Sequence, residues 1–356
     1  MQFCILLTGN WIYLFMNRSI NYKTIFCSLF GLLAIVSLSA YTYFTDHDKP
    51  LEFSKILGAD ISFLPQLEAS GKKFYDGGVE TDAFALLKNH GFNYVRLRIF
   101  NNPAADSGYS KKNFCGLEET KKMALRIKAA QMGFLLDFHY SDNWADPQKQ
   151  FKPAAWKNAS YQQLQDSIHA FTKNTLTALK KQGTLPEMVQ VGNEINHGML
   201  WPDGRIKNLD TLAAFLKAGI SGVKAVDKHI KVMLHIACGG QNTESRFFID
   251  NMLKRGVKFD VIGESYYPEW HGTPDSLRKN LTDLNLRYKQ EVIVAEYSQH
   301  KKEVNDIAFN LPGNKSKGTF TWEPLSWGEA IVDKQGKTNE QVDTYSALSK
   351  TYHIKQ

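Results

Sequence analysis

The feature that most limits how this chain can fold is a repeated order of segments. A stretch with helical spacing of apolar residues ends at a glycine, and a short run of β-branched and apolar residues follows. This order occurs four times, with the glycines at Gly91, Gly133, Gly183 and Gly256. Glycine just past a helix end supplies a left-handed cap, so each position predicts a helix end followed by a strand.

The same alternation continues along the chain after residue 55. It predicts eight strands, over residues 57–62, 94–100, 134–139, 189–191, 231–235, 259–265, 292–296 and 318–322. Helices are predicted beside most of them, over residues 82–90, 117–132, 161–182, 209–226, 244–255, 274–288 and 341–352. Eight such units predict an α/β fold, a closed (β/α)8 TIM barrel, which takes about 250 residues. An open doubly wound sheet is the alternative, but no glycine-rich phosphate loop follows the first strand.

The N-terminal part has a different composition. Residues 24–45 carry no charge, and basic residues precede them. This pattern is typical of a signal peptide or a membrane anchor. We therefore expect residues 1–49 to direct export and residues 50–356 to form a single catalytic barrel domain. That domain would be secreted, periplasmic, or anchored by a membrane tether and facing outside. A start at Met16 would leave a more usual basic leader.

Charge and cysteine content exclude several classes of function. The net charge is +7, but lysine and arginine are scattered and no basic run is interleaved with aromatic residues, so no nucleic-acid partner is expected. Cys115 and Cys238 have no metal-binding spacing; we expect two free buried thiols, with one disulfide as the alternative. His139, Asp142 and His197 match no metal-site spacing either. We expect no metal, no cofactor and a monomer.

In a parallel barrel, function sits where the strands end. Polar side chains at those ends are Asp60, Arg96, Arg98, Asp137, His139, Asn193, Glu194, His235, Glu264, Glu296 and Glu323. Aromatic residues at the last strand's end and in the following loops are Tyr140, Trp144, Trp201, Tyr266, Tyr267, Trp270, Trp322 and Trp327. Aromatic faces beside fixed hydrogen-bonding groups suit a sugar, whose C–H faces stack and whose hydroxyls need polar partners.

Two predicted strands lead directly into glutamates, Glu194 and Glu296, and they lie on opposite sides of an eight-stranded ring. Such a pair suits a retaining glycosidase, in which one carboxylate is the nucleophile and the other is the acid/base. A single glutamate after a strand is more often a surface or helix-start carboxylate. The two together, with Asn193 before one of them, favour catalysis.

Other strand-end residues leave two interpretations open. Arg96 either keeps the nucleophile ionised or forms a structural ion pair. Asp137 and His139 either contact substrate or form a polar network in the core, and His235 is equally consistent with a core histidine. Asp60 is expected to be structural. Trp322 is expected to stack on a sugar because it lies at the mouth of the barrel.

Six sequence blocks resemble glycoside hydrolase family 53, the arabinogalactan endo-β-1,4-galactanases. They are YVRLRIFNNP (94–103), DFHYSDNWADP (137–147), VGNEI (191–195), IGESYYP (262–268), VAE (294–296) and WEP (322–324). The resemblance covers roughly residues 57–350 in order. The block at 137–147 is the most specific, whereas Asn-Glu alone occurs in many retaining barrel glycosidases.

The resemblance implies roles for individual residues. Glu194 would be the acid/base and Glu296 the nucleophile, Asn193 would contact the sugar 2-hydroxyl, and Trp322 would form a platform at the cleavage subsite. The side chains expected to line the substrate site are Arg96, Asp137, His139, Asp142, Trp144, His235 and Tyr267. The expected substrate and partner is β-1,4-galactan.

The sequence also departs from the family pattern. Glu264 stands where an uncharged residue is usual, so it either perturbs the catalytic pair or points away from it. The segment after Glu296 is unusual too, and no Asp-rich set for a structural calcium follows residues 322–324. Two alternatives to galactan hydrolysis remain: an endo-hydrolase of mannan or β-glucan, and a non-catalytic, membrane-tethered glycan-binding barrel.

Overall fold

The structure is a computed structural model that describes residues 53–313 and 315–355. The chain divides between Pro50 and Leu51 into two units, and the second holds the barrel. The predicted signal peptide or anchor lies outside the described residues. No helix within the described ranges is long and apolar enough to cross a membrane.

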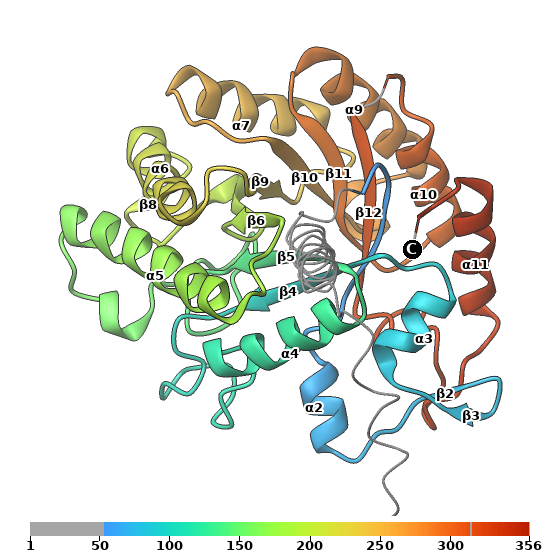
Figure 1. The fold of residues 1–356 in the computed structure, drawn as a ribbon. Coiled ribbons are helices and arrows are strands. Elements are labelled where there is room, and N and C mark those ends of the chain that lie inside the picture. The colour runs from blue at the N-terminus through green and yellow to red at the C-terminus, as the bar shows by residue number, and fades with distance from the viewer. Residues whose placement is uncertain (1–52, 314, 356) are drawn as a thin grey trace, which may run out of the picture. The chain divides into compact units, whose positions relative to one another are not determined.

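Eight parallel strands close into a barrel, which confirms the predicted (β/α)8 fold (Figure 1). Around the ring they are β1 (Ile56–Asp60), β12 (Ser316–Trp322), β11 (Glu291–Tyr297), β10 (Val261–Tyr266), β9 (Lys231–Ile236), β6 (Met188–Val191), β5 (Gly133–Phe138) and β4 (Tyr94–Ile99). Each predicted strand is present, with ends that differ by a few residues.

Helices form the outer layer of the barrel (Figure 1). They are α3 (Ala83–Asn89), α4 (Leu117–Ala129), α5 (Tyr161–Gln182), α6 (Leu209–Val226), α7 (Asn242–Lys254), α9 (Pro274–Arg287), α10 (Lys301–Phe309) and α11 (Gln341–Thr351). Helix α10 was not predicted. It is short and rich in charge, although Val304, Ile307 and Ala308 have helical spacing and are buried.

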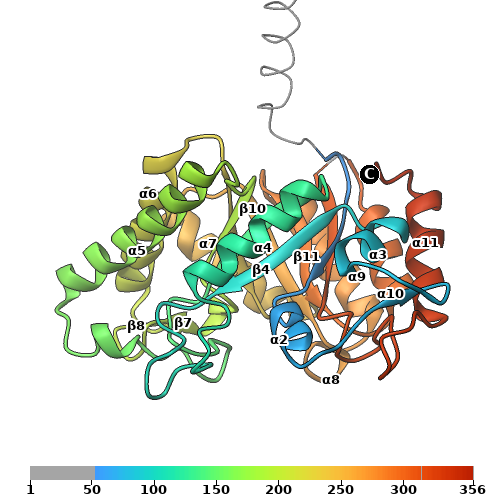
Figure 2. The same ribbon diagram turned by 60° about the horizontal axis from the view of Figure 1, so that its bottom comes forward.

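Short elements lie in the loops that follow the strands. They are α2 (Leu64–Ala69), α8 (Pro268–His271), the 3-10 turns η1 (Ala154–Trp156) and η2 (Ile195–His197), and the hairpins β2 (Tyr75–Asp76)–β3 (Val79–Glu80) and β7 (Gly198–Met199)–β8 (Gly204–Arg205). Figure 2 shows α2, α8, β7 and β8 at one end of the barrel. That end carries the carboxyl ends of the strands.

The predicted glycine caps are correct for three of the four positions. Gly183 ends α5 in the left-handed region with φ 75°, and Gly91 and Gly256 also have positive φ. Gly133 is different because it is the first residue of β5. A Cβ there would lie 2.2 Å from the Tyr94 ring, so the glycine permits a close approach between strands instead of capping a helix.

The barrel interior is apolar at its amino-terminal end. Side chains that point inward there form one buried cluster: Ile56, Tyr94, Leu135, Met188, Met233, Val261, Ile293, Ala295 and Phe320. Burial of each large apolar side chain contributes about 1.5–3 kcal/mol. This apolar plug fills the amino-terminal part of the barrel, so the functional groups are confined to the carboxyl-terminal end of the strands.

Glu264 points out of the barrel, toward α7 and α9. It is fully buried, and its carboxyl accepts hydrogen bonds from the Ser245 hydroxyl at 2.7 Å, the Cys238 N–H at 3.1 Å and the Asn280 amide at 3.3 Å. Burial raises the pKa of Glu264 to about 8, although these hydrogen bonds act in the opposite direction. The sequence alternative in which this carboxylate points away from the catalytic pair is therefore correct.

We predict that Glu264 makes folding less favourable as pH rises. Its pKa is raised from 4.5 to about 8 in the folded state, so its stabilising contribution is complete below about pH 4.5 and is lost as pH rises through 8. The change is at most about 1.4 kcal/mol per pH unit. Glu264→Gln should gain stability relative to wild type between pH 5 and 8 in chemical denaturation.

The exposed Glu118→Gln is the control for this measurement, since it should not change the shape of the curve. The assignment would be contradicted if the free energies of unfolding of wild type and Glu264→Gln changed with pH in the same way.

Candidate active site

The backbone is strained at Glu194, where the chain leaves the barrel. This residue follows the end of β6 and adopts the left-handed region, with φ 48° and ψ 52°, before the 3-10 turn η2 begins at Ile195. A non-glycine residue rarely adopts this conformation, which costs about 1–3 kcal/mol. The turn redirects the chain at this point and places the Glu194 carboxyl in the mouth of the barrel.

Glu296 reaches the same mouth because β11 contains a bulge. Val294 pairs with Glu264, but Ser265 pairs with Glu296, so Ala295 is the extra residue. Ala295 belongs to the inward cluster, and Glu296 also contacts groups inside the barrel. In a regular strand, neighbouring side chains point to opposite faces. The bulge therefore turns Glu296 inward, where an unbroken strand would turn it toward the helices.

Arg96 on β4 is the centre of the site. Its Nε donates to Gln190 Oε1 at 3.2 Å. The other four N–H groups bond to Asp60 at 3.0 Å, Glu296 at 2.9 Å, Asp137 at 2.9 Å and Asn193 at 2.8 Å. Burial alone would lower its pKa, but Asp137, Glu296 and Asp60 raise the pKa of Arg96, so it is a permanent cation. The structural ion pairs of Arg96 are therefore present, and one of them is with Glu296; the functional interpretation of Arg96 stays a prediction.

The Glu296 carboxylate accepts hydrogen bonds from two side-chain donors. Arg96 Nη1 donates to Oε2, and the Tyr267 hydroxyl donates to Oε1 at 2.7 Å. Burial and the Glu296 charge raise the pKa of Tyr267 far above its usual value, which keeps the phenol a donor. Both interactions stabilise the anionic form that a nucleophile needs.

Glu194 has the opposite electrostatic setting. Its Oε1 accepts the Ser265 hydroxyl at 2.7 Å. Burial, followed by the nearby Glu296 charge, raises the pKa of Glu194 to about 8. At neutral pH the group therefore holds a proton, as a general acid must. Two neighbouring carboxyls with such different surroundings are the expected signature of an acid and nucleophile pair.

A chain of hydrogen bonds holds Ser265 against the acid. His235 Nε2 lies 2.8 Å from the Ser265 hydroxyl, and His235 Nδ1 lies 3.0 Å from the Gln190 amide nitrogen. Burial lowers the pKa of His235 far below its usual value, so the ring is neutral. His235 Nδ1 also lies 3.0 Å from the Asn193 amide oxygen, and the Ser265 hydroxyl in turn donates to Glu194 Oε1 at 2.7 Å.

Asp137 and His139 form a second part of the buried network. His139 Nε2 lies 3.1 Å from Asp137 Oδ2, and His139 Nδ1 accepts the Ala145 N–H at 3.1 Å. Burial opposes ionisation of Asp137, but Arg96 and His139 lower its pKa below the usual value. The interpretation of this pair as a core network is thus correct, and His139 also lines the cavity.

Aromatic side chains form one wall of the site. The Trp322 ring at the end of β12 lies edge-on to Phe63, Trp144 and Trp327, at centroid distances of 5.8, 6.2 and 5.4 Å. The Arg98 guanidinium lies 4.4 Å from the rings of both Phe63 and Trp144. This cation–π contact fixes the Trp144 ring, so the wall is rigid before a ligand arrives.

A cavity of about 130 Å³ lies between these groups. It is lined by Asp60, Arg96, Arg98, His139, Trp144, Ala145, Asp146, Asn193, Glu194, Glu296 and Trp322. Both glutamates therefore face one hollow, together with five of the nine predicted substrate-binding residues. Asp60 was expected to be structural; it bonds to Arg96 and also lines the hollow.

The other predicted residues lie around this cavity. Asp137, His235 and Tyr267 hold its lining groups through hydrogen bonds. Asp142 lies in a loop, where its two oxygens accept the N–H groups of Asn102 and Ala154 at 2.9 and 2.8 Å. Its contact with substrate stays a prediction, as does the contact of Asn193 with a sugar hydroxyl.

Sequence reasoning missed Gln190 and Ser265. Both are inward residues of buried strands, and both bond directly to groups of the predicted site. For Gln190 the signal was available, because it precedes Glu194 on a strand with strict alternation and is polar among apolar neighbours. Ser265 gave a weaker signal, since its inward direction follows from strand phase alone.

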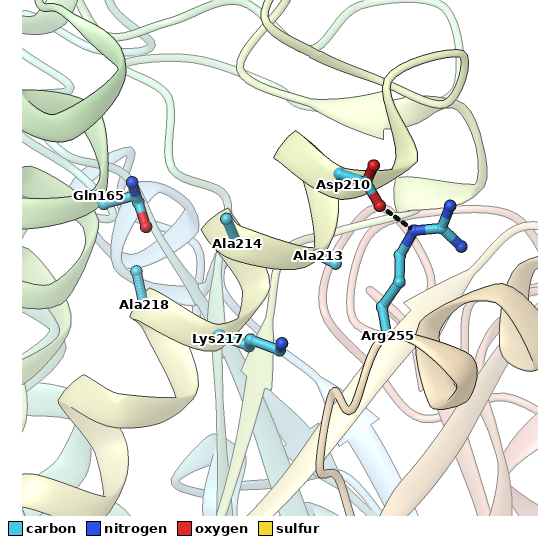
Figure 3. Close-up of a pocket in the computed structure, with 7 residues that line it drawn as sticks. All are labelled: Gln165, Asp210, Ala213, Ala214, Lys217, Ala218 and Arg255. Atoms are coloured by element: carbon cyan, nitrogen blue, oxygen red, sulfur yellow. Dashed lines mark hydrogen bonds and ion pairs between the residues drawn. The ribbon is translucent and has the colours of Figure 1, made fainter.

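A larger hollow of about 420 Å³ lies on the outer helical layer, beside α5 and α6 (Figure 3). Its lining is Gln165, Asp210, Ala213, Ala214, Lys217, Ala218 and Arg255. The Arg255 guanidinium already bonds to Asp210 at 2.7 Å. Mostly small aliphatic and solvated groups line this hollow, and it lies away from the strand ends. The smaller cavity, which both glutamates line, is therefore the candidate active site.

The sequence model of glycosyl hydrolase family 53 matches residues 56–333. The chain belongs to this family. The match confirms the resemblance seen in the six sequence blocks, and it makes the barrel a glycoside hydrolase. The strand-end glutamates are therefore the catalytic candidates of a family 53 enzyme.

Relatives and solved structures agree with this assignment. A protein of Niallia circulans, described as an uncharacterized protein in the bgaB 5' region, is 40% identical over 76% of this chain and 83% of its own. The arabinogalactan endo-β-1,4-galactanase of Cellvibrio japonicus is 36% identical over 73% of this chain and 70% of its own. The family 53 catalytic domain of Ignisphaera aggregans has 33% identity and a TM-score of 0.77, covering 83% of this chain and 98% of that domain.

We predict that Ser265 sets the basic limb of the pH profile. Activity requires protonated Glu194, so kcat/KM should fall as pH rises through about 8. The Ser265 hydrogen bond lowers the Glu194 pKa, and its removal in Ser265→Ala should move the limb upward by about one pH unit.

The control is Ser298→Ala, which removes the hydroxyl of another buried serine just after β11. Its basic limb should match wild type in the same kcat/KM series. An unmoved limb in Ser265→Ala would show that this hydroxyl does not act on the acid.

Proposed function

We propose that this chain is a retaining, endo-acting glycoside hydrolase that cleaves β-1,4-galactosidic bonds in galactan and arabinogalactan. The observation that carries the proposal is the contrast between the two carboxyls of one cavity. Glu296 accepts hydrogen bonds from Arg96 and Tyr267, whereas burial and the Glu296 charge raise the pKa of Glu194 to about 8.

In the first step Glu296 attacks the anomeric carbon and Glu194 gives its proton to the leaving oxygen. The C–O bond to the leaving sugar breaks as the bond from Glu296 Oε to the sugar forms. Retaining enzymes hold their two carboxyls about 5–5.5 Å apart. The effect of the Glu296 charge on the Glu194 pKa indicates that they interact closely.

In the second step Glu194 acts as a base. It has lost its proton, so it can take one from a water molecule that attacks the anomeric carbon and releases Glu296. When Glu296 is bound covalently to the sugar, its negative charge is gone. The repulsion that raised the Glu194 pKa then disappears, so the same residue is more readily ionised at the moment when a base is needed.

The choice of galactan rests on family membership and on the Cellvibrio japonicus relative, which is an arabinogalactan endo-β-1,4-galactanase. The aromatic wall of Trp144 and Trp322 is consistent with stacking on a sugar ring. We predict galactose oligomers as the products from linear β-1,4-galactan, measured by chromatography. Cleavage of mannan or β-glucan with none of galactan would reverse the substrate assignment.

We predict that the two glutamates respond differently to azide. Glu296→Ala should reduce galactan cleavage by about 10⁴-fold or more, because no covalent intermediate can form. With β-galactobiosyl fluoride, Glu194→Ala should still form the intermediate, and azide should release it as the β-azide. Glu296→Ala should yield the α-azide by direct displacement. If Glu194→Ala gave the α-azide and Glu296→Ala gave the β-azide, the two roles would be reversed.

Folding is the control in this comparison. Arg96 retains Asp60 and Asp137 in the Glu296→Ala variant, so we expect circular dichroism like that of wild type. Galactan cleavage within a few-fold of wild type would remove Glu296 from the mechanism.

We further propose that residues 1–49 direct export and that the enzyme acts outside the cytoplasm, as a monomer. The uncharged stretch at residues 24–45, preceded by basic residues, supports this proposal. Fractionation of the source cells, with N-terminal sequencing of the native protein, tests it. Recovery in the cytoplasm with an intact N-terminus would contradict it.

A further inference from the structure

Two loops cross beside the acid/base residue and are fastened to its backbone. The first follows β5, and its Gln150 side chain donates to the carbonyl oxygens of Asn193 at 2.8 Å and Glu194 at 3.4 Å. The second follows η2, and its Trp201 N–H donates to the Gln150 carbonyl at 2.7 Å. Movement of either loop would therefore disturb the segment that carries Glu194.

Further contacts hold the two loops together. Phe151 and Trp201 form an isolated parallel bridge, and Lys152 Nζ lies 2.8 Å from Asp203 Oδ2. His197 Nδ1 lies 2.9 Å from the Pro147 carbonyl oxygen. The crossing is thus a rigid part of the barrel mouth and not a loosely attached surface loop.

This rigid crossing presents aromatic side chains to solvent. Phe151 is 62% exposed. Trp201 is half-buried, its indole N–H donates to the His197 carbonyl at 3.1 Å, and the Arg205 guanidinium lies 4.1 Å from its ring. Holding an exposed phenylalanine this firmly stabilises the fold little, because the ring stays in water. We call Phe151 and Trp201 the aromatic ledge.

A short stretch of chain joins the ledge to the lining of the cavity. Ala145 and Asp146 line that cavity, and Asp146 pairs with Lys149 across a tight turn, which brings the chain directly to Gln150 and Phe151. The β7–β8 hairpin that follows Glu194 carries Trp201, and it lies at the mouth end of the barrel (Figure 2). The acid protonates the leaving oxygen, so the leaving sugars lie on the side of Glu194 and its attached loops.

We propose that the aromatic ledge binds the galactose units on the leaving side of the scissile bond. This inference rests on the proposed galactanase function and extends it. One face of a galactose ring carries a patch of C–H groups because its 4-hydroxyl is axial, and that patch stacks on an aromatic ring. The ledge increases the affinity for chains that extend beyond the cleavage point, and it favours cleavage within a polymer.

The test compares two substrates that differ only in what leaves. In linear β-1,4-galactan the leaving group is a galactose chain, whereas in β-galactobiosyl fluoride it is fluoride, which occupies no sugar subsite. Phe151→Ala should lower kcat/KM on galactan about five- to tenfold, the effect of losing one well-placed aromatic contact. On the fluoride, kcat/KM should stay within about twofold of wild type.

Two matched variants serve as controls. Phe151→Tyr keeps the ring and should retain wild-type kcat/KM on galactan. Phe247→Ala removes a phenylalanine of similar exposure, 51%, from the outer surface of α7 and should change neither substrate.

Two results would contradict the proposal that the ledge binds the leaving sugars. One is wild-type kcat/KM of Phe151→Ala on galactan, and the other is an equal loss on both substrates, which would indicate a disturbed acid instead of a lost subsite. Failure of the proposed function looks different, because wild-type enzyme would then cleave neither galactan nor the fluoride, and the ledge proposal would fall with it.

Discussion

The site depends on one buried cation. The five N–H groups of Arg96 meet five acceptors contributed by four strands or strand ends, and three of those acceptors are carboxylates. Without the guanidinium, Asp60, Asp137 and Glu296 would be negative charges in a space shielded from water, and each would take up a proton or move away. With it, each of these carboxylates has a positive charge within hydrogen-bonding distance. The same guanidinium thus joins the strands and prepares the chemistry.

The interior of the barrel is divided along its axis, and this division explains why the polar cluster is tolerated. The apolar plug at the amino-terminal end provides burial energy, while the ring of charges lies at the end that opens toward the loops. Glu194 is placed where burial and repulsion from Glu296 keep its proton, and the neutral His235 holds Ser265 against one of its oxygens. The two carboxyls of the site are therefore distinguished by their neighbours, since both are glutamates.

Much of this arrangement was predictable from the sequence because it follows from periodicity. Alternation of strands and helices predicted the barrel, and strand ends predicted Glu194, Glu296 and Arg96. Features that depend on packing were not predictable. Gly133 resembled a helix cap, but the Tyr94 ring requires its lack of a side chain. Helix α10 is too short and charged to stand out, and the direction of Glu264 became clear only from the strand phase in three dimensions.

The bulge in β11 has a consequence for how such enzymes change. It allows Ala295 to fill the interior while its neighbour Glu296 also turns inward. If all residues of β11 paired regularly with β10, without the bulge, Glu296 would turn out among the helices, although the amino acid would still be present in the chain. The reactivity of this barrel is thus encoded partly in strand register, so a change in pairing, as well as a substitution, is a route by which evolution could silence it or regain it.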